Sequence, residues 1–187
     1  MNQTTQKFLI LLENRSNENK ESISLLMQNG LLGNAISVLR QEIDSFIRVV
    51  YLAQMTDFSY REELMNRTLN GEKWTEEGKR RRITDREMVD ITSNLKGYVQ
   101  YAYKFGCSFI HLSDSHNYQE KDPFDSLPIQ EQRDIAFYLN YYHGFPMETK
   151  LSIESVKPLI LSIFDKITNN MWCYTNHLKE GTVLVDY

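Results

Sequence analysis

ITSNLKGYVQYAYKFGCSFIHLSDSH, residues 91–116, decides the fold class of this chain. Apolar residues recur along it at alternating spacings of four and three, which is typical of one helix face packed against other helices. The stripe ends on a histidine and comprises Ile91, Leu95, Tyr98, Ala102, Phe105, Phe109, Leu112 and His116. We therefore predict an all-α protein, a bundle of about five to six helices that includes long antiparallel helices.

The flanking sequence supplies the other helices. Thr84 followed by Glu87 is a capping-box pattern and starts the long helix. Elsewhere Asn-Gly pairs and His143-Gly144 mark helix ends. The polar middle of the first helix allows a break near residues 16–19. We expect helices over residues 4–27, 34–54, 60–69, 84–116 and 128–143, and a last one that begins within 152–155 and ends near 179.

Composition indicates one soluble helical domain over residues 1–187, with a short tail from 181. The formal net charge of −4 argues against bulk attraction to nucleic acid or to an anionic membrane, but it allows a local basic site. No signal peptide and no membrane span are recognisable, and two cysteines make no disulfide framework. We expect a cytoplasmic protein. Because glycine-rich phosphate loops and metal motifs are absent, we expect no cofactor and no metal.

The helix expected over 34–54 carries a ladder of charges at its apolar edge. Arg40, Asp44 and Arg48 follow one another at intervals of four residues. A buried guanidinium needs an anionic partner, and Asp44 is the nearest candidate for Arg40. Two interpretations stay open: a structural ion pair between helices, or an arginine that binds an anion or phosphate beside its orienting carboxylate.

Two other helices each bring a histidine to an expected buried face. In the long helix, Ser113 and His116 fall on the core arc, whereas His111 points to the opposite side. In the last helix, Asn170 and His177 share the apolar arc. Such residues are more often hydrogen-bonded core groups than catalysts. The candidate catalytic residues are His116, Arg40 and Asp44, and the candidate ligand-binding residues are His177, Asn170, Ser113 and Arg48.

The loop over 72–82 contains a run of four cations, residues 79–82, close to Trp74. A run of this kind is usually a solvated surface, and it is weak evidence for contact with a phosphate backbone. Trp74 offers a surface on which a base can stack. Exposed aromatic residues such as Tyr103 and Tyr141 suggest an oligomer interface.

Two short segments resemble a known family. LRQEID at 39–44 with FIR at 46–48, and FIHLSDSH at 109–116, are similar to helices of HEPN-like bacterial proteins. The resemblance implies an α-helical bundle, often a dimer, in a family with many ribonucleases, including toxins and phage-defence effectors. Some members work with a nucleotidyltransferase-type antitoxin partner. Their catalytic signature is an arginine followed four to six residues later by histidine, and no arginine stands at that distance before a histidine in this chain.

Three functions follow as hypotheses. The first is a non-catalytic HEPN-like module that binds a partner protein, a nucleotide or RNA in a toxin–antitoxin or defence setting. The second is a metal-independent ribonuclease, with His116 as general acid or base, Arg40 stabilising the phosphate and Asp44 orienting Arg40. The third is a structural homo-oligomer that leaves an apolar face exposed.

Overall fold

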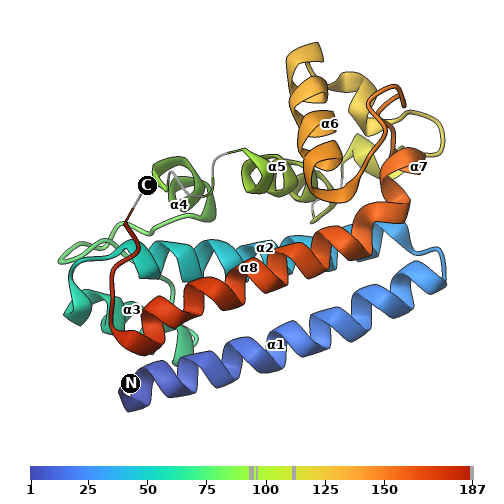
Figure 1. Cartoon of the computed structure of the whole chain (residues 1–187). Helices are drawn as coiled ribbons and strands as arrows, with labels where there is room; N and C mark the ends of the chain where they lie inside the picture. The colour runs from blue at the N-terminus through green and yellow to red at the C-terminus, as the bar shows by residue number, and fades with distance from the viewer. Residues whose placement is uncertain (93–94, 96, 111–112, 186–187) are drawn as a thin grey trace. The chain divides into compact units, whose positions relative to one another are not determined.

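The computed structural model describes residues 1–92, 95, 97–110 and 113–185 (Figure 1). The predicted all-α class is confirmed, since helices dominate these residues and their only β-type pairing is an isolated bridge between Thr75 and Arg82. The elements in chain order are α1 (Gln3–Gln28), α2 (Leu32–Gln54), α3 (Phe58–Leu69), α4 (Asp85–Ile91), α5 (Tyr98–Ile110), the 3-10 helices η2 (Asp114–Asn117) and η3 (Pro123–Ser126), α6 (Ile129–His143), α7 (Ile153–Val156), the 3-10 helix η4 (Lys157–Leu159) and α8 (Ile160–Glu180).

The chain groups into two compact units that both draw on distant segments of sequence. Unit 1 comprises Met1–Glu18, Asp44–Lys96 and Thr168–Tyr187. Unit 2 comprises Asn19–Ile43 and Gly97–Ile167. Helices α1, α2 and α8 contribute residues to both units. Neither unit is a continuous stretch of chain, so composition and charge along the sequence show no boundary between them.

Unit 1 is held together at the end of α2 by a buried arginine. Arg61 of α3 donates hydrogen bonds to the carbonyl oxygens of Ala53 (3.3 Å), Met55 (2.5 Å) and Thr182 (3.1 Å). The amide of Leu184 donates to the same Ala53 carbonyl at 2.8 Å. Burial lowers the pKa of Arg61. The C-terminal segment therefore packs against the end of α2, and forms no strand over its described residues.

Unit 2 explains why α1 continues through its polar middle without the break that the sequence allowed. The side-chain amide of Asn19 donates a 2.9 Å hydrogen bond to the carboxylate of Glu42, which is fully buried on α2. In unit 1, Ser16 is also buried. These polar residues lie on the inner face of the helix, so the polar composition of the stretch is not a sign of solvent exposure.

The prediction of one long helix over 84–116 is wrong. The capping box of Thr84 and Glu87 starts α4, as expected, but α4 ends at Ile91 and Thr92 is extended. Helix α5 begins only after Gly97, whose φ of +81° lies in the left-handed region that favours glycine. At the other end Ser113 is extended, with φ −144° and ψ 173°. These backbone conformations end a helix whatever the side-chain pattern around them.

The apolar stripe expected to be buried is buried in its middle and exposed at its ends. Tyr98 and Phe109 are buried, whereas Ile91 is 66% exposed. Leu112 lies outside the described residues, and so does His111. Gly106 of α5 allows a close approach between helices, because a β-carbon there would lie 2.9 Å from the β-carbon of Arg40 on α2. This glycine sets how closely α5 packs on α2.

Candidate functional site

A polar cleft of about 470 Å³ lies in unit 1. It is bordered by α1, α2, the end of α3, the loop that follows α3 and the start of α4. We call it the basic cleft, because four cationic side chains line it against two carboxylates. Its residues are Arg15, Arg48, Thr68, Gly71, Glu72, Lys73, Trp74, Arg82, Ile83, Thr84 and Asp85.

Arg48 is the most firmly positioned cation of the basic cleft. Its Nη2 donates to Asp85 at 2.9 Å, and its Nε lies 3.4 Å from Asp44. Its guanidinium also lies over the ring of Trp74, 4.8 Å from the centroid. Asp44 lies 3.4 Å from Arg15 as well, so one carboxylate holds arginines of α1 and α2. The i, i+4 spacing on α2 therefore pairs Asp44 with Arg48.

Trp74 is not the exposed stacking surface that the sequence suggested. Only 3% of the residue is exposed, and its indole N–H donates to Thr68 Oγ1 at 2.8 Å. Its ring packs against Tyr51, with centroids 6.1 Å apart. Trp74 therefore forms the floor of the basic cleft and supports Arg48, and it is unavailable for stacking on a base.

The residues of the cationic run at 79–82 have different surroundings in the structure. Lys79 contacts Glu76 at 2.7 Å, and Arg81 contacts both Glu76 and Glu87. The hydrogen bond from Lys79 contributes most to lowering the pKa of Glu76. Arg82 instead lines the basic cleft. The isolated β-bridge between Thr75 and Arg82 closes this loop and holds the backbone of Arg82 in place.

Arg40 lies in unit 2, in a setting made by α5. Only 5% of it is exposed; its guanidinium lies over the ring of Tyr103, 4.2 Å from the centroid, and its Nε donates to Cys107 Sγ at 3.4 Å. Burial is the largest cause that raises the pKa of Tyr103. The aliphatic stem of Arg40 packs on Gly106. Tyr103 is therefore half-buried under Arg40, and it does not present the free aromatic surface expected of it.

His116 is exposed, and the prediction that it lies on a buried helix face is wrong. It belongs to η2, where it forms a capping box with Ser113: the Ser113 amide donates to His116 Nδ1 at 3.5 Å. The Ser113 hydroxyl donates to the Ser108 carbonyl at 2.6 Å. Both candidates thus stabilise the local turn that replaces the end of the predicted helix.

His177 and Asn170 are half-buried on the part of α8 that belongs to unit 1. His177 Nδ1 lies 2.9 Å from the hydroxyl of Thr182, just after the helix end. Among the sequence-based candidates, the structure therefore brings Asp44 and Arg48 together, and Ser113 and His116 together. Arg40 of α2 contacts Tyr103 and Cys107 of α5.

Sequence reasoning missed His143, the last residue of α6. Its Nδ1 lies 3.1 Å from Ser162 Oγ, and its Nε2 lies 2.9 Å from the hydroxyl of Tyr98. Ser162 donates its own proton to the Leu159 carbonyl, so Nδ1–H donates to Ser162 and Nε2 accepts from Tyr98. Burial, and then the charge of Lys166, lower the pKa of His143. The only sequence signal was a histidine before Gly144.

The chain was compared with protein-family models, with curated proteins and with solved structures. No match was found in any of the three. Over the described ranges, no cluster of three or more histidine, cysteine or acidic residues is arranged to hold a metal ion, and both cysteines are free. In the same part of the chain no helix is both long enough and apolar enough to cross a membrane. The case for function therefore rests on the geometry of the residues.

Proposed function

We propose that this chain is a non-catalytic HEPN-like helical module that binds RNA or a nucleotide by its phosphates, in the basic cleft. One observation carries the proposal. Lys73 and Arg82 are exposed on the cleft and make no ion pair within the described residues, next to an arginine already held in place. Cations that are positioned and not neutralised are what a phosphate group requires.

The local charge favours an anion although the whole chain is acidic. Arg15, Arg48, Lys73 and Arg82 line the cleft, and the carboxylates of Glu72 and Asp85 line it with them. Asp44 lies behind, where it orients two of the arginines. Arginine suits phosphate because its planar guanidinium donates two parallel hydrogen bonds. With a net charge of −4 on the chain, attraction is confined to this cleft and its surroundings.

The settings of His116 and Arg40 support binding over cleavage. His116 caps its own turn, and Arg40 is buried against Tyr103. The ribonuclease hypothesis needs an accessible arginine beside that histidine. Ribonuclease activity stays a prediction, which cleavage assays check. A homodimer and a nucleotidyltransferase-type partner also stay predictions, and sedimentation with and without candidate partners checks them.

The test is fluorescence anisotropy with a labelled single-stranded RNA at low salt. We expect the double variant Lys73→Ala/Arg82→Ala to bind about tenfold more weakly, as the loss of about 1.4 kcal/mol of phosphate contacts requires. The matched control is Lys7→Ala/Lys179→Ala, which removes the same charge from exposed positions of unit 1 that do not line the cleft. An equal loss in both doubles would show diffuse attraction and contradict the proposal, as would a wild-type protein that does not bind.

Two further arms separate the possible ligands and activities. Competition by ATP against the labelled RNA distinguishes two kinds of site. At a site for a mononucleotide, ATP displaces the RNA at equal phosphate concentration. At a site that needs several linked nucleotides, ATP does not displace it. Electrophoresis of the recovered RNA detects cleavage. Intact RNA supports the non-catalytic proposal, whereas fragments that disappear with His116→Ala would establish the ribonuclease instead.

A further inference from the structure

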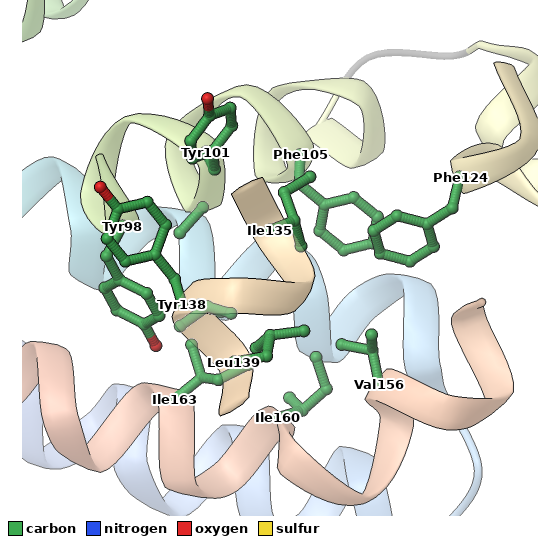
Figure 2. A pocket seen from close by; sticks show the side chains of 12 residues that line it. Tyr98, Tyr101, Phe105, Phe124, Ile135, Tyr138, Leu139, Val156, Ile160 and Ile163 are labelled. Atoms are coloured by element: carbon green, nitrogen blue, oxygen red, sulfur yellow. The ribbon is translucent and has the colours of Figure 1, made fainter. Parts of the chain in front are cut away.

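Unit 2 contains a small apolar cavity that the proposed function does not use. It has a volume of about 50 Å³ and lies between α5, α6 and the α7–α8 segment, with one residue of α2 (Figure 2). Its lining holds only aliphatic and aromatic side chains: Leu39, Tyr98, Tyr101, Ala102, Phe105, Phe124, Ile135, Tyr138, Leu139, Val156, Ile160 and Ile163. We call it the apolar cavity.

Hydrogen bonds outside the cavity hold the hydroxyls of two of its tyrosines, Tyr98 and Tyr101. Tyr98 donates to His143, and Tyr101 donates to Asp134 at 2.6 Å. The hydrogen bond to Asp134 contributes most to raising the pKa of Tyr101 to about 12. Figure 2 shows the oxygens of these two rings at the ends away from the Phe105–Phe124 pair. The rings therefore present carbon to the cavity, and they offer a ligand no polar group inside it.

The size of the cavity suits several atoms, and its chemistry rejects water. One water-sized probe occupies roughly 10–15 Å³ on this measure, so there is room for more than one. A water needs two or more polar partners, which this lining does not offer. An apolar cavity left empty forfeits the dispersion contacts of its walls. A small apolar group that enters it recovers those contacts.

The cavity has an amphipathic rim. Tyr101, Ala102 and Ile135 are half-buried, so the wall between α5 and α6 reaches the surface. Polar side chains stand at that edge: Asp134 beside Tyr101, and Lys104, whose Nζ is 3.4 Å from Glu131 and 5.8 Å from the Tyr101 ring centroid. A slender ligand can keep a polar end there while its apolar end lies inside.

We propose that the apolar cavity of unit 2 binds a short alkyl chain that carries a polar head group at the α5–α6 rim. The proposal is independent of the basic cleft and of RNA. It names a ligand class, a short-chain alcohol or a related amphiphile, because the lining excludes a polar body and the volume excludes a bulky one.

The test uses a series of 1-alkanols from 1-butanol to 1-hexanol, and follows the methyl NMR signals of Leu39, Leu139 and Val156 on titration. In the wild-type protein we expect affinity to rise about fourfold, the factor that corresponds to 0.8 kcal/mol, for each methylene that the cavity of about 50 Å³ can take, and to level off for longer chains. Xenon, a probe without a head group, should shift the same signals. Wild-type signals that do not move would overturn the proposal.

The variant Ile135→Phe fills the cavity, and Ile129→Phe is its matched control, because Ile129 is an exposed residue of the same helix. We expect 1-hexanol affinity to fall at least tenfold in Ile135→Phe and to stay unchanged in Ile129→Phe. If circular dichroism shows Ile135→Phe to be unfolded, Ala102→Leu fills the cavity from α5 and replaces it. Equal affinity in the filled and control variants would also overturn the proposal.

Discussion

The basic cleft of unit 1 and the apolar cavity of unit 2 are built on opposite principles. The basic cleft is large and open, about 470 Å³, and its cations are oriented by carboxylates and by the face of Trp74. The apolar cavity is about 50 Å³, and His143 and Asp134 hold the hydroxyls of two of its tyrosines, Tyr98 and Tyr101, outside it. In both places, polar contacts made outside the site determine which chemical groups face a ligand.

The difference teaches how each site responds to its surroundings. A cluster of charges is screened by salt, so binding there depends on ionic strength. Binding by contact between carbon atoms does not depend on ionic strength in this way. Conversely, substitutions that change packing disturb the apolar cavity, whereas the rim of an open cleft tolerates truncation. Experiments that change packing, salt and pH in turn therefore separate the two sites, and the expected effect becomes smaller in that order.

The largest effect is expected from Gly106→Val in α5, the helix that supplies Ala102 and Phe105 to the apolar cavity. The new β-carbon would lie 2.9 Å from the β-carbon of Arg40, an atom close to the backbone that cannot move aside. We expect a loss of about 2–3 kcal/mol in the free energy of unfolding, measured by urea titration.

The control for that substitution is Lys104→Val, which introduces the same branched residue at an exposed position of α5. Helix propensity alone predicts a loss below about 1 kcal/mol there. A Gly106→Val protein as stable as this control would show that α5 and α2 do not pack as closely as described.

A smaller effect, in the salt dependence of binding, sharpens the comparison. For RNA in the basic cleft, we expect Arg82→Ala to reduce the slope of log affinity against log salt concentration by about 0.7, the value for one phosphate contact to a single strand. Binding of 1-hexanol in the apolar cavity should be the same at all these salt concentrations. A slope unchanged by Arg82→Ala would place the phosphate contacts elsewhere.

The smallest effect is expected from pH. Burial and Lys166 lower the pKa of folded His143 below the value of about 6.5 in the unfolded chain. The unfolded state therefore takes up the proton first, and the stability contributed by neutral His143 is lost as pH falls below about 6.5. The other groups at the ring are Tyr98 and Ser162, and Lys166 lies over the neighbouring ring of Tyr142, 3.8 Å from its centroid.

Calorimetry of wild type and His143→Gln between pH 7.5 and 5 checks this. We expect the wild-type Tm to fall by about 1–3 °C more than that of the variant over this range. Parallel curves for the two proteins would mean that His143 does not titrate as described, and that another group orients Tyr98.

Local periodicity predicted the helices well, because a buried face repeats in sequence wherever a helix packs. It placed α2 correctly, together with the spacing of four residues by which Asp44 pairs with Arg48, although the partner expected for Asp44 was Arg40. It failed over 91–116, where the backbone conformations of Thr92, Gly97 and Ser113 do not fit a helix although the apolar spacing continues around them. His116 was therefore assigned to an interior that it does not reach.

The candidate site was predictable only in part, because its geometry comes from distant segments. Nothing in the sequence near Arg48 indicates that Asp85 and Trp74 stand beside it. Equally, the run at 79–82 looks uniform in sequence, and only the positions of Glu76 and Glu87 distinguish Lys79 and Arg81 from Arg82. The hydrogen bonds that link Tyr98, His143 and Ser162 join three helices, and no local sequence pattern indicates them.

The segment after α8 has a consequence for how the protein is made. Thr182 and Leu184 bond to Arg61 and to Ala53, so unit 1 joins segments from the beginning, the middle and the end of these residues. A ribosome releases a chain from its N-terminus, at roughly 5–20 residues per second. During synthesis α1, α2 and α3 therefore emerge without this contact, and residues 97–167 complete unit 2 before residues 168–187 complete unit 1. We expect released chains that end at residue 167 to protect unit 2 from proteolysis and to leave unit 1 open to it.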